Sequence, residues 1–277
     1  MDIISAPSPN FRPRSTDVPW QESVQHLVLH YTELNLTDSL NRLRARESEV
    51  SCHYLVDEEG AVHQLVADRH VAFHAGLSFW RGVKNLNATS IGIELVNMGH
   101  AAALPAYQPE QLASLIQLCR QLIDRYPIPA VNIVGHSDIA PSRKLDPGEH
   151  FPWLLLAEAG IGLWPVLEDG GFEEGEGAGA PDADPDPAAT YLAVQQNLRQ
   201  IGYELVVPQG GAGVAQGLRE GGADGVAQGF EDRSEDGADP LALPLLAFQR
   251  RWLPHHLNGQ PDTLTRRRLA QVAGFYL

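Results

Sequence analysis

The chain has 277 residues, of which 35 are acidic and 20 are basic, and its formal net charge is −15. This length allows one large hydrophobic core and a smaller module, so we expect two domains. The acidic balance excludes a general nucleic-acid binder, because phosphate contacts need clustered lysine and arginine. The absence of any run of about 18 apolar residues excludes an integral membrane segment.

The first predicted elements lie between Gln25 and about Gly162, where short apolar runs alternate with amphipathic ones. This alternation is typical of a mixed α/β domain. In chain order we predict a strand at "QHLVLHY" (25–31), a hairpin at "CHYLVDEEGAVHQLV" (52–66), a strand at "TSIGIELV" (89–96) and a helix at "PEQLASLIQLCRQLIDRY" (109–126). A further strand, "AVNIVG", places His136 directly at its end.

The composition changes after Trp164, where an acidic segment rich in glycine and proline begins. Such a segment cannot bury enough apolar surface to fold, so it is predicted as a linker. The remainder is predicted as a small all-α domain whose first helix ends at Gly202. A glycine-rich, flexible insertion at about 206–239 interrupts that domain. The predicted division is an N-terminal extension at 1–23, a main domain at 24–164, a linker at 165–188 and a helical domain at 189–277.

The stretch "GHSDIAPSRKLDPG" places His136 and Asp146 in one loop that is stiffened by prolines. A catalytic zinc site uses three protein ligands, commonly imidazole nitrogen and carboxylate oxygen, and leaves one position for water. His136 and Asp146 suit two of these positions. The third ligand must come from another segment, and the first strand offers His26 and His30 on one face. His30 lies at the end of that strand and is the better candidate, since the two lie too far apart to ligate together.

Four motifs occur in the order found in a known enzyme family: "HLVLHYTE", "CHYLVDEEG", "FHAGLSFWRGVKNLNATSIGIEL" and "GHSDIAPSRKLDPGEHFPW". Over roughly residues 24–164 they resemble the zinc-dependent N-acetylmuramoyl-L-alanine amidases of the AmpD/AmiD type. The resemblance implies a mixed central sheet flanked by helices, as in amidases and peptidoglycan-recognition proteins. In the second domain, "VQQNLRQIGY", "AFQRRW" and "NGQPDTLTRRRL" resemble a small helical peptidoglycan-binding domain.

The resemblance also implies site residues. His30, His136 and Asp146 match the zinc ligands of the family, and Glu94 matches its catalytic glutamate. Glu94 alternates to the face opposite its apolar neighbours, where it could take up and deliver a proton; the alternative is an ordinary solvent-facing strand residue. Lys144 would place an ammonium near the oxyanion of the reaction, and its alternative is an ordinary surface lysine.

Substrate contacts are implied for the segment between His74 and Asn87. His74 resembles a residue of the substrate groove, and the alternative is a structural histidine that hydrogen-bonds the adjacent loop. Arg81 and Asn87 belong to a polar and aromatic loop, which suits peptide carboxylates and amide hydrogen bonds.

The implied function is hydrolysis of the amide bond between N-acetylmuramic acid, or its anhydro form, and L-alanine by a zinc-activated water. Zn²⁺ is the expected cofactor, peptidoglycan or muropeptides are the expected partners, and a monomer is the expected state. Two alternatives stay open: a non-catalytic peptidoglycan-recognition protein, and a metallopeptidase that cuts within the peptide stem, although the H-x-H and H-E-x-x-H patterns are absent.

Two further expectations concern the helical domain and the compartment. The domain either anchors the enzyme to polymeric cell wall or only packs on the main domain. A wall-binding domain favours the bacterial envelope, whereas the lack of an apolar leader at the N-terminus favours the cytoplasm.

Overall fold

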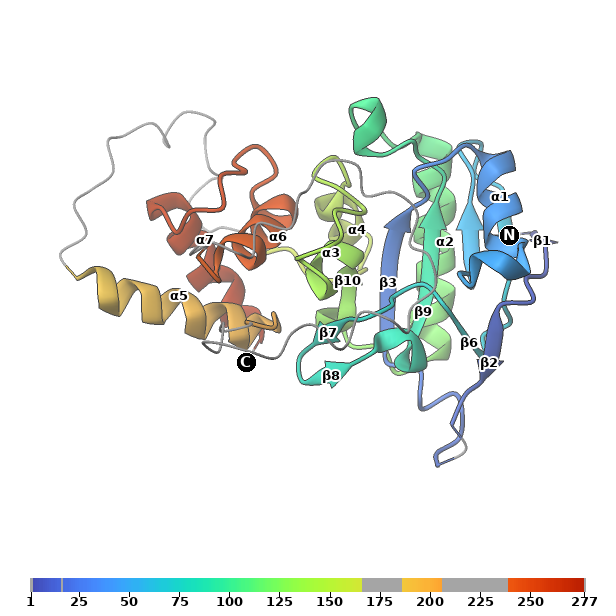
Figure 1. The fold of residues 1–277 in the computed structure, drawn as a ribbon, viewed down its shortest axis with the longest axis horizontal. Coiled ribbons are helices and arrows are strands. Elements are labelled where there is room, and N and C mark those ends of the chain that lie inside the picture. The colour runs from blue at the N-terminus through green and yellow to red at the C-terminus, as the bar shows by residue number, and fades with distance from the viewer. Residues whose placement is uncertain (1, 16, 166–185, 206–238, 277) are drawn as a thin grey trace.

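The computed structural model describes residues 2–15, 17–165, 186–205 and 239–276 (Figure 1). Its centre is a six-stranded sheet with the strand order β1-β5-β4-β9-β3-β10. These strands are β1 Ile3–Ser5, β3 His26–Tyr31, β4 Tyr54–Val56, β5 Val62–Gln64, β9 Ser90–Leu95 and β10 Ile133–Gly135. Strands β4, β9, β3 and β10 are parallel, while β5 is antiparallel to β4. The predicted mixed α/β fold is therefore confirmed.

The remaining elements surround this sheet. Two short two-stranded sheets pair β2 (Phe11–Pro13) with β6 (His70–Ala72) and β7 (Phe79–Trp80) with β8 (Val83–Lys84). The α-helices of the described residues are α1 Leu36–Arg44, α2 Pro109–Arg125, α3 His136–Ile139, α4 Trp153–Glu158, α5 Pro187–Ile201, α6 Ala242–Trp252 and α7 Thr263–Ala273. Within that part of the chain, no helix is long and apolar enough to cross a membrane.

The longest predicted helix is α2, and the predicted hairpin is formed by β4 and β5. Pro109 opens α2, and the apolar residues that follow at three-and-four spacing form one buried stripe. Part of the segment predicted as an N-terminal extension belongs to the central sheet, because β1 pairs with β5. A strand of three residues is too short to show a periodic pattern, so the sequence offered no signal for it.

One face of the central sheet is apolar and is covered by α2 and α4 (Figure 1). Leu27 and Leu29 of β3 point to this face, as do alternate residues of β9. Leu115, Leu118 and Leu122 of α2 pack on them. This face holds the main hydrophobic core.

The opposite face is divided into three zones. At one end, Leu55 packs with apolar residues that include Leu43 of α1 and Val96. At the centre lie His30 and Glu94, which are paired in register on neighbouring strands and so point the same way. At the other end, Val28 and Val134 pack with α3 and with helices from the end of the chain. The polar centre of this face is therefore held between two apolar zones.

The C-terminal region, defined here as residues 186–205 and 239–276, is helical in all its regular elements. Asp186 caps the start of helix α5, since its side chain accepts a hydrogen bond from the Ala189 amide, and Gly202 caps its end with a positive φ of 139°. The helices lie beside β10 and α3 at one edge of the sheet (Figure 1). Most of the predicted linker and insertion, 165–188 and about 206–239, falls outside the described residues.

Candidate active site

Three buried side chains converge at the centre of the second sheet face. One ligand-type atom each of His30, His136 and Asp146 lies within 4.8 Å of the others. Asp146 Oδ2 is 2.9 Å from His30 Nδ1 and 3.1 Å from His136 Nδ1, and the two Nδ1 atoms are 3.0 Å apart. The three residues are separated by up to 116 positions in the chain and meet only in the folded protein.

The sheet register brings the two histidines together. Leu29 of β3 is paired with Gly135 of β10, so the next residues along each strand are His30 and His136. His26 begins β3, and its ring is near the Thr89 carbonyl instead, 3.3 Å away. Between the two histidines of the first strand, the structure therefore places His30 in the cluster.

Asp146 is brought to the cluster by a loop that folds back over the end of β10. The Ser137 amide donates to the Asp146 carbonyl at 2.8 Å, which ties the loop to α3. A Cβ at Gly135 would lie 2.6 Å from Pro147 Cδ, so only glycine allows the loop to approach this closely.

Hydrogen bonds on the far side of each ring leave both Nδ1 atoms free to accept. His136 Nε2 lies 3.2 Å from the Ala75 carbonyl, which can only accept, so Nε2 carries the proton. His30 Nε2 lies 3.0 Å from His74 Nδ1, and His74 Nε2 lies 3.1 Å from Ser90 Oγ. Ser90 in turn donates to the Leu86 carbonyl, so this chain is satisfied when His30 and His74 are also protonated on Nε2.

The charges in the cluster suit a divalent metal. Burial lowers the pKa of His136 to about 4, against the opposing effect of Asp146, so its imidazole is neutral. Burial tends to raise the pKa of Asp146, but its proximity to His136 and His30 brings the pKa well below its usual value. Zinc binds neutral imidazole and ionised carboxylate, and ligand bonds of about 2.1 Å separate tetrahedral ligand atoms by roughly 3.4 Å. The donor types and their spacing fit such a site.

Glu94 lies on β9 directly beside His30. Its Oε2 atom is buried and has no hydrogen-bond partner among the described residues. Burial raises the pKa of the carboxyl well above its usual value, the Asp146 carboxylate raises it further, and the Lys144 ammonium opposes both. A carboxyl with a free oxygen next to the cluster is available to exchange a proton with a bound molecule.

Lys144 is half-buried on the loop that carries Asp146. Its backbone amide donates to the Ala140 carbonyl at 3.1 Å. The positive charge of its side chain lowers the pKa of both Glu94 and His136.

The three residues predicted to contact substrate have partners inside the protein. His74 is buried behind His30, between that ring and Ser90. Asn87 Oδ1 accepts hydrogen bonds from the His74 and Ala75 amides. Arg81 donates to the carbonyls of Gln200 and Ile201 in the C-terminal region. These contacts use Asn87 Oδ1 and Arg81 Nη1 within the protein, and substrate contact by the three residues stays a prediction.

Gly92 was missed by the sequence analysis although it shapes the site. A Cβ at this position would lie 2.4 Å from His74 Cγ, so the ring can pack on β9 only because residue 92 is glycine. A glycine inside a strand of β-branched residues often marks a close approach of this kind, and "SIGIE" carried that signal.

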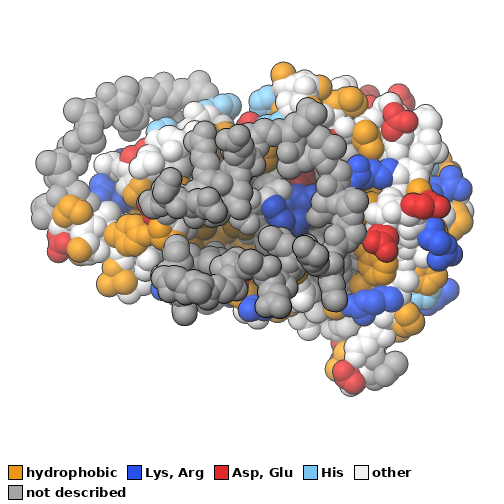
Figure 2. All heavy atoms as spheres, in the orientation of Figure 1, with side chains coloured by type: hydrophobic (Ala, Val, Ile, Leu, Met, Phe, Trp, Pro, Cys, Tyr) orange, Lys and Arg blue, Asp and Glu red, His pale blue; other side chains and the backbone are white. Residues whose placement is uncertain are grey.

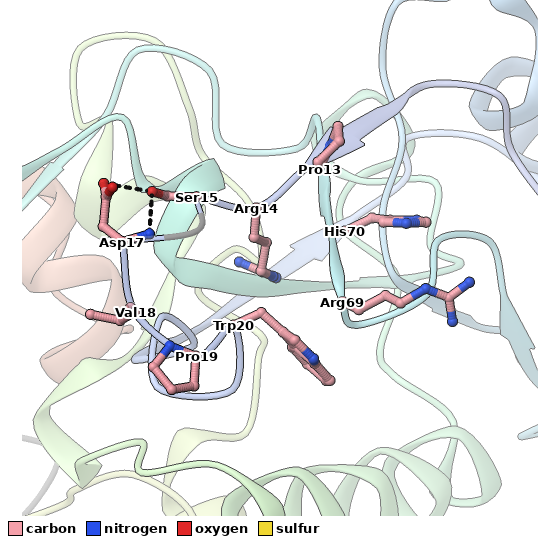
Figure 3. Close-up of a pocket in the computed structure, with 9 residues that line it drawn as sticks. All are labelled: Pro13, Arg14, Ser15, Asp17, Val18, Pro19, Trp20, Arg69 and His70. Carbon is pink, nitrogen blue, oxygen red and sulfur yellow. Dashed lines mark hydrogen bonds between the residues drawn. The ribbon is translucent and has the colours of Figure 1, made fainter.

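A surface hollow of the described residues lies away from this cluster (Figure 3). It is lined by residues 13–15 and 17–20 together with Arg69 and His70. Arg14, which borders it, is buried and donates to the carbonyls of Asp68, Ala88 and Ser90. No residue of the metal-type cluster lines this hollow, and its arginine serves to tie the N-terminal segment to the sheet.

Known proteins resemble this chain over the same segments. A family model described as N-acetylmuramoyl-L-alanine amidase matches residues 20–149. The N-acetylmuramoyl-L-alanine amidase AmiD of Escherichia coli K12 is 44% identical over 194 residues, which cover 66% of this chain and 67% of that protein. The 1,6-anhydro-N-acetylmuramyl-L-alanine amidase AmpD of the same organism is 43% identical over 104 residues, which cover 38% of this chain and 55% of that protein.

Two solved structures are similar over nearly the whole chain. One is E. coli AmiD in complex with the substrate anhydro-N-acetylmuramic acid-L-Ala-D-gamma-Glu-L-Lys, with a TM-score of 0.69, 31% identity, and coverage of 96% of this chain and 93% of that one. The other is AmpDh3 of Pseudomonas aeruginosa in complex with anhydromuramic pentapeptide, with a TM-score of 0.67, 31% identity, and coverage of 95% and 96%.

Proposed function

Because the chain belongs to the N-acetylmuramoyl-L-alanine amidase family, we propose that it hydrolyses the amide bond between N-acetylmuramic acid, or its 1,6-anhydro form, and L-alanine in peptidoglycan fragments. The similar structures with bound anhydromuramyl peptides support this choice of substrate. The observation that carries the proposal is the buried convergence of His30, His136 and Asp146 beside an unpartnered Glu94 oxygen.

The three converging residues would hold a zinc ion. Two neutral imidazoles and one carboxylate are a known donor set for a catalytic zinc that keeps one open position. A bound zinc ion would polarise a carbonyl and lower the pKa of water at that position. The hydrogen bonds from Nε2 of His30 and His136 fix the orientation of both rings and keep Nδ1 free for the metal.

Glu94 would handle the protons of the reaction. Its free Oε2 can accept a proton from the attacking water and later deliver it to the amine of the leaving L-alanine. The register that places Glu94 opposite His30 keeps the carboxyl on the face where substrate must bind.

Lys144 would stabilise the negative charge that develops on the carbonyl oxygen. This role is supported by the loop that carries both Lys144 and Asp146 and by the electrostatic effect of the ammonium on Glu94 and His136. A fixed positive charge in a partly buried site favours an oxyanion more strongly than it would in water.

The C-terminal region would contribute contacts to polymeric cell wall. Figure 2 shows hydrophobic side chains on the outer surface over α5. Exposed apolar residues of this region include Leu192, Leu243 and Phe275, and exposed apolar surface of this kind can mark an interaction site. A variant with serine at these three positions is expected to bind sacculi less and to cleave small muropeptides at the unmutated rate.

The activity is tested by measuring zinc content and by mass spectrometry of digested anhydromuropeptides. Release of intact stem peptide supports the amidase, shortened stems would indicate a metallopeptidase, and zinc binding without products would indicate a recognition protein. Glu94→Gln is expected to retain zinc and to lower kcat by about a hundredfold to ten-thousandfold, the usual contribution of a general acid–base group. Unchanged kcat in this variant would contradict the role of Glu94.

A further inference from the structure

The helix that carries one of the site histidines is too short to hold itself in place. Helix α3 has four residues, and His136 is its first. A single helical turn is unstable without tertiary contacts. Ile139 and the adjacent Ala140 pack with the C-terminal region, so the position of α3 depends on what lies behind it.

Asp138 is the polar attachment point of α3, and it is 1% exposed. Its Oδ2 accepts from the Gly135 amide at 2.9 Å and from Arg251 Nη1 at 2.8 Å. Its Oδ1 accepts from the Tyr203 hydroxyl at 2.8 Å. Two of these three donors belong to the C-terminal region.

Arg251 is also buried, and it contacts several groups of the main domain. Its Nη2 donates to the Ile133 carbonyl on β10 at 3.1 Å, and its guanidinium lies 3.9 Å from the centre of the Trp153 ring. Arg251 thus contacts both β10, which precedes His136, and α3, which His136 begins. A buried carboxylate that loses its cationic partner is strongly destabilised, because its charge is then uncompensated.

The geometry points to Arg251 and Tyr203 as positioning residues for the metal centre. By holding Asp138 they hold α3, and α3 presents the His136 imidazole to Asp146 and His30. The C-terminal region is then part of the catalytic unit, in addition to any contact it makes with cell wall. This inference rests on the proposed function, because it assumes that the cluster binds zinc.

The test compares full-length variants by their affinity for zinc, measured by competition with a chromophoric chelator, and by the visible spectrum of the cobalt(II)-loaded protein. Arg251→Met removes both hydrogen bonds, Arg251→Lys keeps the charge, and Tyr203→Phe removes one hydroxyl. Arg81→Met is the matched control, since Arg81 also joins the C-terminal region to the main domain but contacts carbonyls of α5 and not α3.

We expect Arg251→Met to weaken zinc binding by about tenfold to a hundredfold, the usual effect of losing a group that orients a ligand. Tyr203→Phe and Arg251→Lys should weaken it severalfold and alter the cobalt spectrum, and Arg81→Met should change neither. A role limited to stability would lower the unfolding temperature of all four variants and leave zinc affinity and spectrum unchanged, which would overturn the inference.

If Arg251→Met does not fold, Tyr203→Phe and Arg251→Lys decide the question, since each retains most of the interface. Folded variants that bind zinc as the unmutated chain does would overturn the inference and leave the proposed function standing. An unmutated chain that binds no zinc would overturn both.

Discussion

The two faces of the central sheet are stabilised in different ways. The face under α2 is apolar throughout, and its helix follows β9 closely in the chain. The opposite face carries buried histidines and acids at its centre, and its apolar zone beside α3 is completed by residues from the far end of the chain. Burying polar groups costs stability unless each is hydrogen-bonded, so the face that carries the chemistry depends on a more distant part of the chain.

Ending the chain at residue 165 tests whether the face that carries the histidines depends on the C-terminal region, and it has the largest expected effect. It would uncover apolar residues such as Trp80, Val134 and Ile139 and remove two of the donors to Asp138. Since each buried apolar side chain contributes about 1.5–3 kcal/mol, we expect a loss of about 5 kcal/mol or more. Thermal unfolding followed by circular dichroism, with a zinc titration, measures it. A shortened chain that melts and binds zinc like the full chain would show that the second face is self-sufficient.

Leu115→Ala tests the apolar face alone. Leu115 is fully buried in α2, and the substitution should lower the free energy of unfolding by about 2–5 kcal/mol. Zinc affinity at a temperature where the protein is folded should stay unchanged, because α2 packs on the face of the sheet opposite the cluster. Urea unfolding and the chelator competition together check this. A weaker zinc site in this variant would mean that the two faces are coupled through the sheet.

Gly92→Ala tests the polar centre. The added Cβ would lie 2.4 Å from the His74 ring, so the ring must move and its bond to His30 is disturbed. We expect a loss of about 1–3 kcal/mol in stability, as for other overpacked sites, together with weaker zinc binding. Gly274→Ala is the control, since a Cβ there meets nothing within 4 Å. Equal zinc affinity in the two variants would argue against a role for His74 in orienting His30.

Glu149→Gln tests a polar contact at the rim of the second face and has the smallest expected effect. Burial raises the pKa of Glu149, but the hydrogen bond from His100 and the charge of Arg250 outweigh it and bring the pKa to about 2. A depressed carboxyl pKa stabilises the fold above about pH 4.5, and this contribution is lost as pH falls toward 2. The variant should be less stable by about 1–2 kcal/mol at pH 6, and the difference should shrink by pH 3. A difference that is constant with pH, in urea unfolding, would contradict this assignment.

Part of the site could be predicted because its signals are local or belong to ordered motifs. The alternation in "SIGIEL" placed Glu94 on the face opposite its apolar neighbours, and β9 confirms that arrangement. The motifs around His30 and His136 pointed to the residues that the structure brings together. The position of His30 at the end of its strand favoured it over His26, and the register of β3 with β10 places His30 beside His136.

Other contacts of these side chains involve residues far away in the chain, and the local sequence gives no sign of them. Substrate contact by Arg81 and Asn87 stays a prediction, and the structure adds that their polar side chains also serve a carbonyl or an amide from another segment. The partner of Asp138 lies 113 residues away at Arg251, and nothing in "HSDI" or "QRRW" indicates that pairing.

Short-range patterns were enough to specify the mixed α/β fold, the hairpin, the long helix and the composition of the donor set, because periodicity and turn chemistry act within a few residues. The convergence of the donors, the use of His74 behind them and the support of α3 by the C-terminal region arose only on folding. Those features depend on register and on hydrogen bonds between residues far apart in the chain, whose partners are selected by the closed structure as a whole.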